Sequence, residues 1–120
     1  MTEAQVELAK RAVWCRGWRW MPGMLAWRPD CPPVRLAAIE DAGNALQEYR
    51  WLPDLTDPAT VGCLLALVRA AWGDSEMHMA LGAKGWVWLT GESRAYDVVI
   101  PINAGETEDE ALVAALEAAP

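Results

Sequence analysis

One segment of the sequence predicts its own structure with both ends marked. Asp57 is followed by Pro58, a pairing typical of a helix N-cap and the first helical residue. Gly73 stands where a C-terminal glycine cap is expected. We therefore expect a central core helix between Asp57 and Gly73. Its apolar stripe recurs at i, i+3, i+4, i+7 and i+11, on Val61, Leu64, Leu65, Val68 and Trp72.

Two further helices are predicted at the ends of the chain. Thr2 and Gln5 form a capping-box pattern, which predicts a helix over residues 3–15 that Gly17 ends. A second capping-box pattern over residues 107–110 begins the last helix, and the acidic residues in its first turn suit the positive end of a helix dipole. The last helix is expected to turn three apolar side chains inward: Leu112, Val113 and Leu116.

Strand signals follow the first helix. Aromatic residues flank the turn signal Pro22-Gly23, so residues 16–28 predict a strand, a turn and a second strand. Residues 29–33 are expected to form a loop or a sheet edge. Residues 34–52 predict a further hairpin, although the end of this stretch is also compatible with a helix.

Three more strands are predicted after the central helix, over residues 77–81, 86–89 and 96–102. Residues 86–89 and 98–100 are apolar at both alternating positions, so both faces of these strands are expected to be buried. The alternative is that one of the two faces meets another subunit.

The order of the predicted elements indicates the fold class. Short hairpins rather than helical crossovers join the strands, which is typical of an α+β fold with an antiparallel sheet packed by about three helices. No linker divides the sequence, so residues 1–120 are expected to form a single small domain. No apolar run approaches the roughly 18 residues of a membrane helix, so no membrane association is expected.

Charge is distributed unevenly along the sequence. The formal net charge is −7, which argues against a general binder of long nucleic acid. Residues 10–35 nevertheless carry six basic residues against one acidic residue, whereas residues 36–120 carry four against 14. This distribution predicts a positive patch that attracts a small anion or phosphate. The alternative is that the acidic balance serves solubility alone.

Residues that could carry catalysis or hold a metal form no specific pattern. The three cysteines, Cys15, Cys31 and Cys63, show no C-x-x-C spacing, and His78 has no nearby Cys or His partner. No phosphate-cradling glycine loop and no nucleophile elbow is present. We therefore expect no enzyme, no metal and no cofactor, and free cysteines indicate a reducing, cytoplasmic compartment.

The unusual feature of the composition is tryptophan, with eight residues in a chain that has no phenylalanine. Several of them are interleaved with arginines early in the sequence. Indole rings can stack on nucleobases, at about 1–3 kcal/mol per base, and guanidinium groups bind phosphate through two parallel hydrogen bonds. The sequence therefore predicts a ligand site made of Trp18, Trp20, Arg16, Arg19 and Arg28.

The predicted strand would place Arg16, Trp18 and Trp20 on one face and Arg19 on the other. Two alternatives remain open for this group. Tryptophan can fill the core where phenylalanine is missing, and Trp and Arg are also enriched at the energetic centres of protein–protein interfaces.

Three stretches of the sequence resemble small hypothetical proteins of phages and prophages. They are residues 57–73 (DPATVGCLLALVRAAWG), residues 7–12 with 18–24, and residues 110–120. The resemblance covers most of the chain and carries no settled activity. It implies a phage accessory protein that acts in the cytoplasm of a bacterial host, where such proteins often counter host immunity.

These observations lead to two hypotheses about function. In the first, the chain is a homo-oligomeric, phage-encoded anti-defence protein (a sponge) that sequesters a nucleotide-type immune signal without cleaving it. In the second, its acidic residues mimic nucleic acid and bind a host defence protein directly. The acidic residues concerned are Glu106, Glu108, Asp109 and Glu110.

Overall fold

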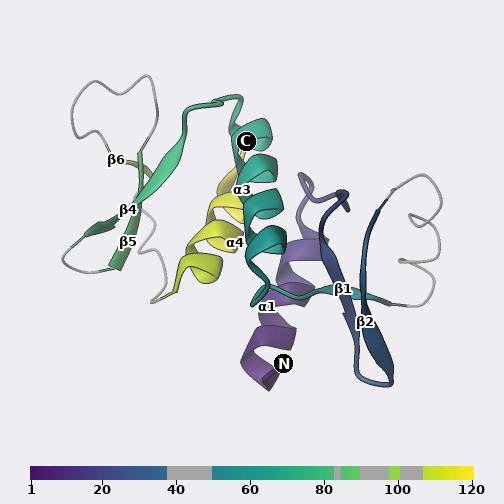
Figure 1. Cartoon of the computed structure of the whole chain (residues 1–120). Helices are drawn as coiled ribbons and strands as arrows, with labels where there is room; N and C mark the ends of the chain where they lie inside the picture. The colour runs from purple at the N-terminus through teal and green to yellow at the C-terminus, as the bar shows by residue number, and fades with distance from the viewer. Residues whose placement is uncertain (38–49, 83–84, 90–97, 101–106) are drawn as a thin grey trace.

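Helix α3 (Pro58–Trp72) lies at the centre of the structure, as its sequence predicts (Figure 1). The carboxylate of Asp57 caps its first turn and accepts a hydrogen bond of 3.0 Å from the backbone N–H of Thr60. Gly73 ends the helix with a φ of 66°, a left-handed conformation that glycine adopts without strain. The helix buries three apolar side chains along its length: Leu64, Leu67 and Val68.

The computed structural model describes residues 1–37, 50–82, 85–89, 98–100 and 107–120. In these ranges the chain has an α+β fold, in which three helices accompany two antiparallel sheets of three strands each. The fold class predicted from the sequence is therefore confirmed. Most of the hairpin predicted over residues 34–52 lies outside the described residues.

Helix α1 (Glu3–Trp14) begins with the predicted capping box. The hydroxyl of Thr2 accepts a hydrogen bond of 3.2 Å from the N–H of Gln5, and the Gln5 side chain accepts one of 2.8 Å in return. The helix ends at Trp14, one residue before the predicted end, and its C-cap is Cys15 in place of the predicted Gly17. Cys15 turns the backbone into an extended conformation while its N–H still donates to the carbonyl of Ala12.

Gly17 has a packing role instead. A Cβ atom at this position would lie 3.0 Å from Cδ1 of Leu116 and 3.2 Å from Cβ of Ala71. The chain leaving α1 therefore approaches α3 and α4 more closely than a larger residue would allow.

Helix α4 (Glu108–Ala118) is capped by Thr107, whose hydroxyl accepts from the N–H of Glu110 at 3.4 Å. The side chain of Trp72 on α3 ties the two helices together by donating a hydrogen bond of 2.9 Å to the carbonyl of Ala115. The three apolar residues predicted to face inward are buried: Leu112, Val113 and Leu116.

The first sheet has the strand order β2-β1-β3. Strand β1 (Leu25–Arg28) pairs antiparallel with β2 (Cys31–Arg35) and with the short β3 (Leu52–Pro53). The sheet edge predicted over residues 29–33 is confirmed in part, because β2 is an edge strand that begins within this range. The strand predicted over the second half of residues 16–28 is β1.

The strand predicted over the first half of residues 16–28 is wrong. The N–H of Trp18 donates to the carbonyl of Cys15 in a turn, and the N–H of Met21 donates to the sulfur of Met24. These donors are used locally and do not pair with a neighbouring strand. The side chain of Trp20 is buried in the core, so tertiary packing overrides the alternating pattern that favoured a strand.

The second sheet follows α3 and has the order β4-β5-β6. Its antiparallel strands are β4 (His78–Gly82), β5 (Gly85–Leu89) and β6 (Val98–Ile100), close to the positions predicted. The side chains of residues 86–89 and 98–100 lie outside the described part of the structure, so the burial of both faces of these strands stays a prediction.

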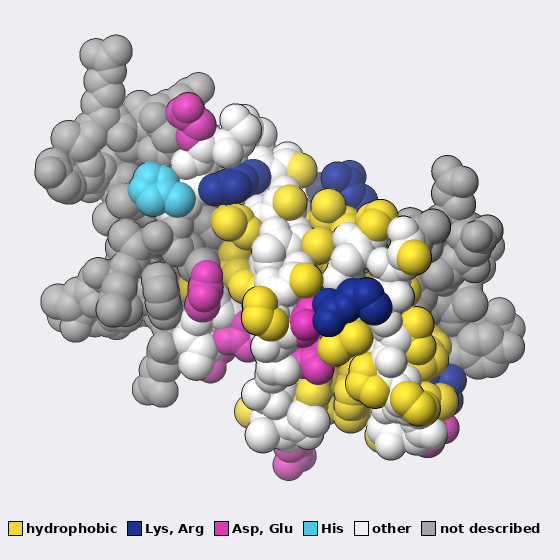
Figure 2. All heavy atoms as spheres, in the orientation of Figure 1, with side chains coloured by type: hydrophobic (Ala, Val, Ile, Leu, Met, Phe, Trp, Pro, Cys, Tyr) yellow, Lys and Arg dark blue, Asp and Glu magenta, His cyan; other side chains and the backbone are white. Residues whose placement is uncertain are grey.

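Hydrophobic side chains gather on the surface over the β1–β2 hairpin (Figure 2), where Pro32, Pro33 and Val34 are exposed. Among the described residues, no helix has the length and apolar character needed to cross a membrane.

Candidate ligand-binding site

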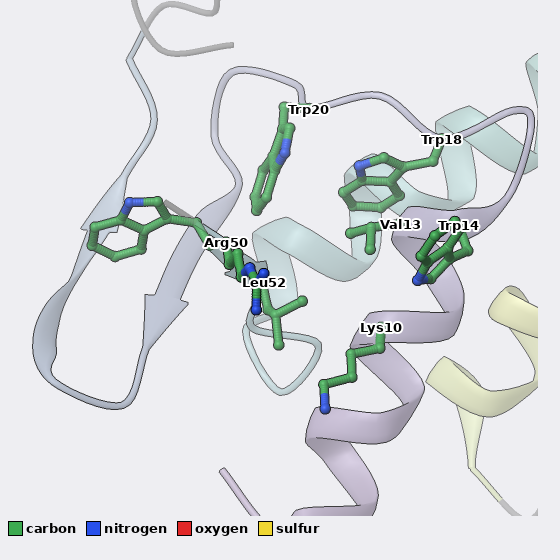
Figure 3. Close-up of a pocket in the computed structure, with 8 residues that line it drawn as sticks. Lys10, Val13, Trp14, Trp18, Trp20, Arg50 and Leu52 are labelled. Atoms are coloured by element: carbon green, nitrogen blue, oxygen red, sulfur yellow. The ribbon is translucent and has the colours of Figure 1, made fainter. Parts of the chain in front are cut away.

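An aromatic pocket lies between α1, the segment that follows it and the chain entering β3 (Figure 3). Its volume is about 630 Å³, within the range of about 300–1,000 Å³ that is usual for small-molecule sites. The lining consists of four indoles, two aliphatic side chains and two cations: Trp14, Trp18, Trp20, Trp51, Val13, Leu52, Lys10 and Arg50.

Helix α1 supplies one wall of the aromatic pocket. Lys10, Val13 and Trp14 are spaced i, i+3 and i+4, so they share one face of the helix. Trp14 is 86% exposed, which is unusual for the largest apolar side chain. An exposed indole on the last turn of a helix is a rigid surface on which a flat ligand can stack.

Trp18 and Trp20 form the next part of the wall. Their rings meet edge to face, with centroids 5.5 Å apart and planes at 80°. Figure 3 shows the indole nitrogen of Trp18 on the side of its ring that faces Trp20, so the positive edge of one ring meets the negative face of the other. This nitrogen is buried and has no hydrogen-bond partner among the described residues.

Trp51, the residue directly before β3, also lines the aromatic pocket. The guanidinium of Arg28 lies over its ring, 5.5 Å from the centroid. Arg28 also forms an ion pair of 3.2 Å with Asp30. The cation–π contact stabilises Trp51 in its orientation and places positive charge against the ring.

The two cations that line the aromatic pocket are accessible. Lys10 forms an exposed ion pair with Glu7 at 3.1 Å, and such pairs contribute little stability, so an anion can replace Glu7. Arg50 is exposed and has a φ of 56°. Non-glycine residues with such a backbone conformation are uncommon and are concentrated at functional sites.

The structure brings together part of the site predicted from the sequence. Trp18 and Trp20 line the aromatic pocket, and Arg28 contacts Trp51 without joining the lining. Arg16 and Arg19 are exposed elsewhere, and Arg16 lines a separate pocket beside Glu117.

Six lining residues were missed in the sequence: Lys10, Trp14, Arg50, Trp51, Val13 and Leu52. The i, i+4 spacing of Lys10 and Trp14 on a predicted helix could have indicated the first two. No local signal relates them to Arg50 and Trp51, which are far away in the sequence.

The alternative that tryptophan fills the core holds for part of this group. Trp20 is only 8% exposed and belongs to the core, and Trp18 packs against the core while lining the aromatic pocket. Trp14 is exposed and does not fill the core.

The thiols of Cys15 and Cys63 show no sign of activation. Burial raises the pKa of Cys15 and, likewise, that of Cys63. Both are therefore thiols at neutral pH, and the thiolate is the reactive form. Within the described ranges, no group of three or more His, Cys, Asp or Glu side chains is placed to hold a metal ion.

The fold and the pocket define an α+β protein with an indole-lined, cation-bearing cavity. Comparisons with known protein families, with curated proteins and with solved structures found no match.

Proposed function

We propose that the chain is a binding protein that holds a small nucleotide-type ligand in the aromatic pocket and sequesters it without cleaving it. The observation that carries this proposal is the convergence of four indoles and two cations on one cavity. Indoles stack on nucleobases, at about 1–3 kcal/mol per base. Lys10 and Arg50 supply the positive charge that a phosphate requires.

The cations decide between two kinds of ligand that a tryptophan-lined pocket can bind. Cages of tryptophan side chains commonly bind quaternary ammonium groups through cation–π attraction. Here Lys10 and Arg50 line the aromatic pocket, and Arg28 already lies over Trp51. These positive charges would repel a cationic ligand, so a ring that carries an anion fits better.

The lining also supports retention of the ligand over its conversion. None of the eight described lining residues carries a carboxylate, thiol, hydroxyl or imidazole group. These are the side chains that most often act as general base or nucleophile. Together with the resemblance to phage accessory proteins, this supports an anti-defence sponge for a nucleotide immune signal.

Native mass spectrometry of the protein mixed with linear and cyclic nucleotides tests the proposal. We expect a stoichiometric adduct of unchanged ligand mass, lost in Trp14→Ala and retained in the control Arg19→Gln. Trp14 is 86% exposed, so its removal should leave the fold intact. An adduct of altered mass would indicate an enzyme. Absence of any adduct would favour the acidic inhibitor of a host protein, which a pull-down from host lysate would then test.

A further inference from the structure

We propose that the aromatic pocket takes a ligand with two linked ring-and-phosphate units, that is, a dinucleotide rather than a mononucleotide. This inference rests on the proposed function. Its basis is that two separate segments each bring one indole and one cation to the lining, and we treat each segment as a half-site: Lys10 and Trp14 on α1, and Arg50 and Trp51 directly before β3.

The first half-site lies on α1. Lys10 and Trp14 are four residues apart on the same helical face, and both line the aromatic pocket (Figure 3). The exposed indole of Trp14 offers a stacking surface, and the ammonium of Lys10 forms an exposed ion pair with Glu7. A nucleotide that stacks on Trp14 can therefore bring its phosphate to Lys10.

The second half-site lies directly before β3. Trp51 is oriented by Arg28 over its ring, so its conformation is set before a ligand arrives. The neighbouring Arg50 has a left-handed backbone, with a φ of 56°, where glycine or asparagine would be less strained. Arg50 nevertheless supplies a cation to the lining of the aromatic pocket.

The surfaces between the half-sites are apolar. Val13, Leu52 and the edge-to-face pair of Trp18 and Trp20 complete the lining, without any further cation among the described residues. A mononucleotide would use one indole and one cation and leave the other pair in water. A ligand with two such units engages both pairs at once.

Linking two units makes the second contact intramolecular, which raises affinity about 10²–10⁴-fold over either unit alone when the geometry allows both to bind. Isothermal titration calorimetry with the four nucleoside 5′-monophosphates and the four 5′-phosphorylated homodinucleotides measures this ratio. We expect the preferred dinucleotide to bind the wild-type chain at least about 100-fold more tightly than its monophosphate.

Two variants and one control test which residues give the preference for dinucleotides over monophosphates. Lys10→Gln/Trp14→Ala removes the first half-site at exposed positions, and Arg50→Asn removes the second cation while suiting the left-handed backbone. The first variant should bring the affinity ratio close to one, and the second should lower it at least tenfold. Arg19→Gln removes an exposed cation outside the aromatic pocket and should leave the ratio unchanged.

The outcomes separate the two proposals. Equal affinity of monophosphates and dinucleotides for the wild-type chain would overturn the two-unit inference and leave the proposed function standing. A dinucleotide affinity that survives Lys10→Gln/Trp14→Ala would also overturn the inference. If none of the eight ligands binds, the two-unit inference fails; if native mass spectrometry also finds no adduct with cyclic nucleotides, the proposed function fails with it.

Discussion

The guanidinium of Arg35 donates two hydrogen bonds to the carboxylate of Asp57, one of them 2.9 Å long, and thereby joins strand β2 to the N-terminus of helix α3. The same guanidinium donates to the carbonyl of Gly23 at 3.0 Å. Asp57 also accepts from the N–H and the hydroxyl of Thr60. The carboxylate of Asp57 thus caps helix α3 and also binds the β1–β2 hairpin through Arg35.

The first prediction concerns the pH dependence of stability. Hydrogen bonding from Arg35, with smaller contributions from Thr60, lowers the pKa of Asp57 from its ordinary 3.8 to about 2. The folded chain therefore binds this proton less readily than the unfolded chain. The stabilisation is complete above about pH 4 and is lost as the pH falls toward 2.

Urea unfolding followed by circular dichroism at several pH values tests this. In Asp57→Asn the part of the pH dependence between about pH 4 and 2 should be missing, because the amide does not titrate. A pH dependence identical to that of the wild-type chain would contradict the assignment.

The second prediction concerns Thr60, a fully buried polar side chain. Its hydroxyl accepts from the N–H of Leu25 at 2.9 Å and donates to Asp57 at 2.9 Å, so it links β1 to α3. Thr60→Val keeps the shape but leaves a buried donor without its partner, at a cost of about 1–3 kcal/mol in the free energy of unfolding. Thr60→Ser retains the hydroxyl and should lose less. If valine were as stable as threonine, the link would not matter to stability.

The third prediction separates the core tryptophan from the exposed one. Trp20 is 8% exposed, so Trp20→Ala should lower the free energy of unfolding by about 3–5 kcal/mol. Trp14 is 86% exposed, so Trp14→Ala should change it by no more than about 0.5 kcal/mol while weakening ligand binding. Chemical denaturation of both variants measures the difference. Equal losses of stability would mean that Trp14 has a structural role.

The fourth prediction compares two glycines. A Cβ on Gly17 would lie 3.0 Å from Leu116 and 3.2 Å from Ala71, so Gly17→Ala should destabilise the fold by about 1–3 kcal/mol. Gly62 lies on α3, and a Cβ there would meet nothing within 4 Å. Gly62→Ala should therefore stabilise the fold by about 0.8–1.0 kcal/mol through helix propensity. Thermal unfolding of the pair should give shifts of opposite sign, and shifts of the same sign would contradict this packing.

Local signals in the sequence were sufficient for the helices and most of the described strands. Each helix begins at the cap expected for it, on Thr2, Asp57 or Thr107, because a cap depends on side chains within three residues of the backbone N–H groups that they satisfy. The end of α3 at Gly73 followed from the same local chemistry. Apolar periodicity then identified buried residues of α4, and on α3 it identified Leu64 and Val68 but not Leu67. The other stripe residues of α3 are partly buried against the core: Val61, Leu65 and Trp72.

Only the tertiary structure decided what residues 16–21 and the binding residues do. The alternation of Arg and Trp favoured a strand, but Gly17 packs against α3 and α4, and Trp20 enters the core instead of lying on a sheet. The aromatic pocket joins Trp14 on α1 to Trp51 at β3. A sequence pattern relates residues along one helix or strand. A pocket forms where separate elements pack together, so the packing of these elements around a common core decided which residues line it.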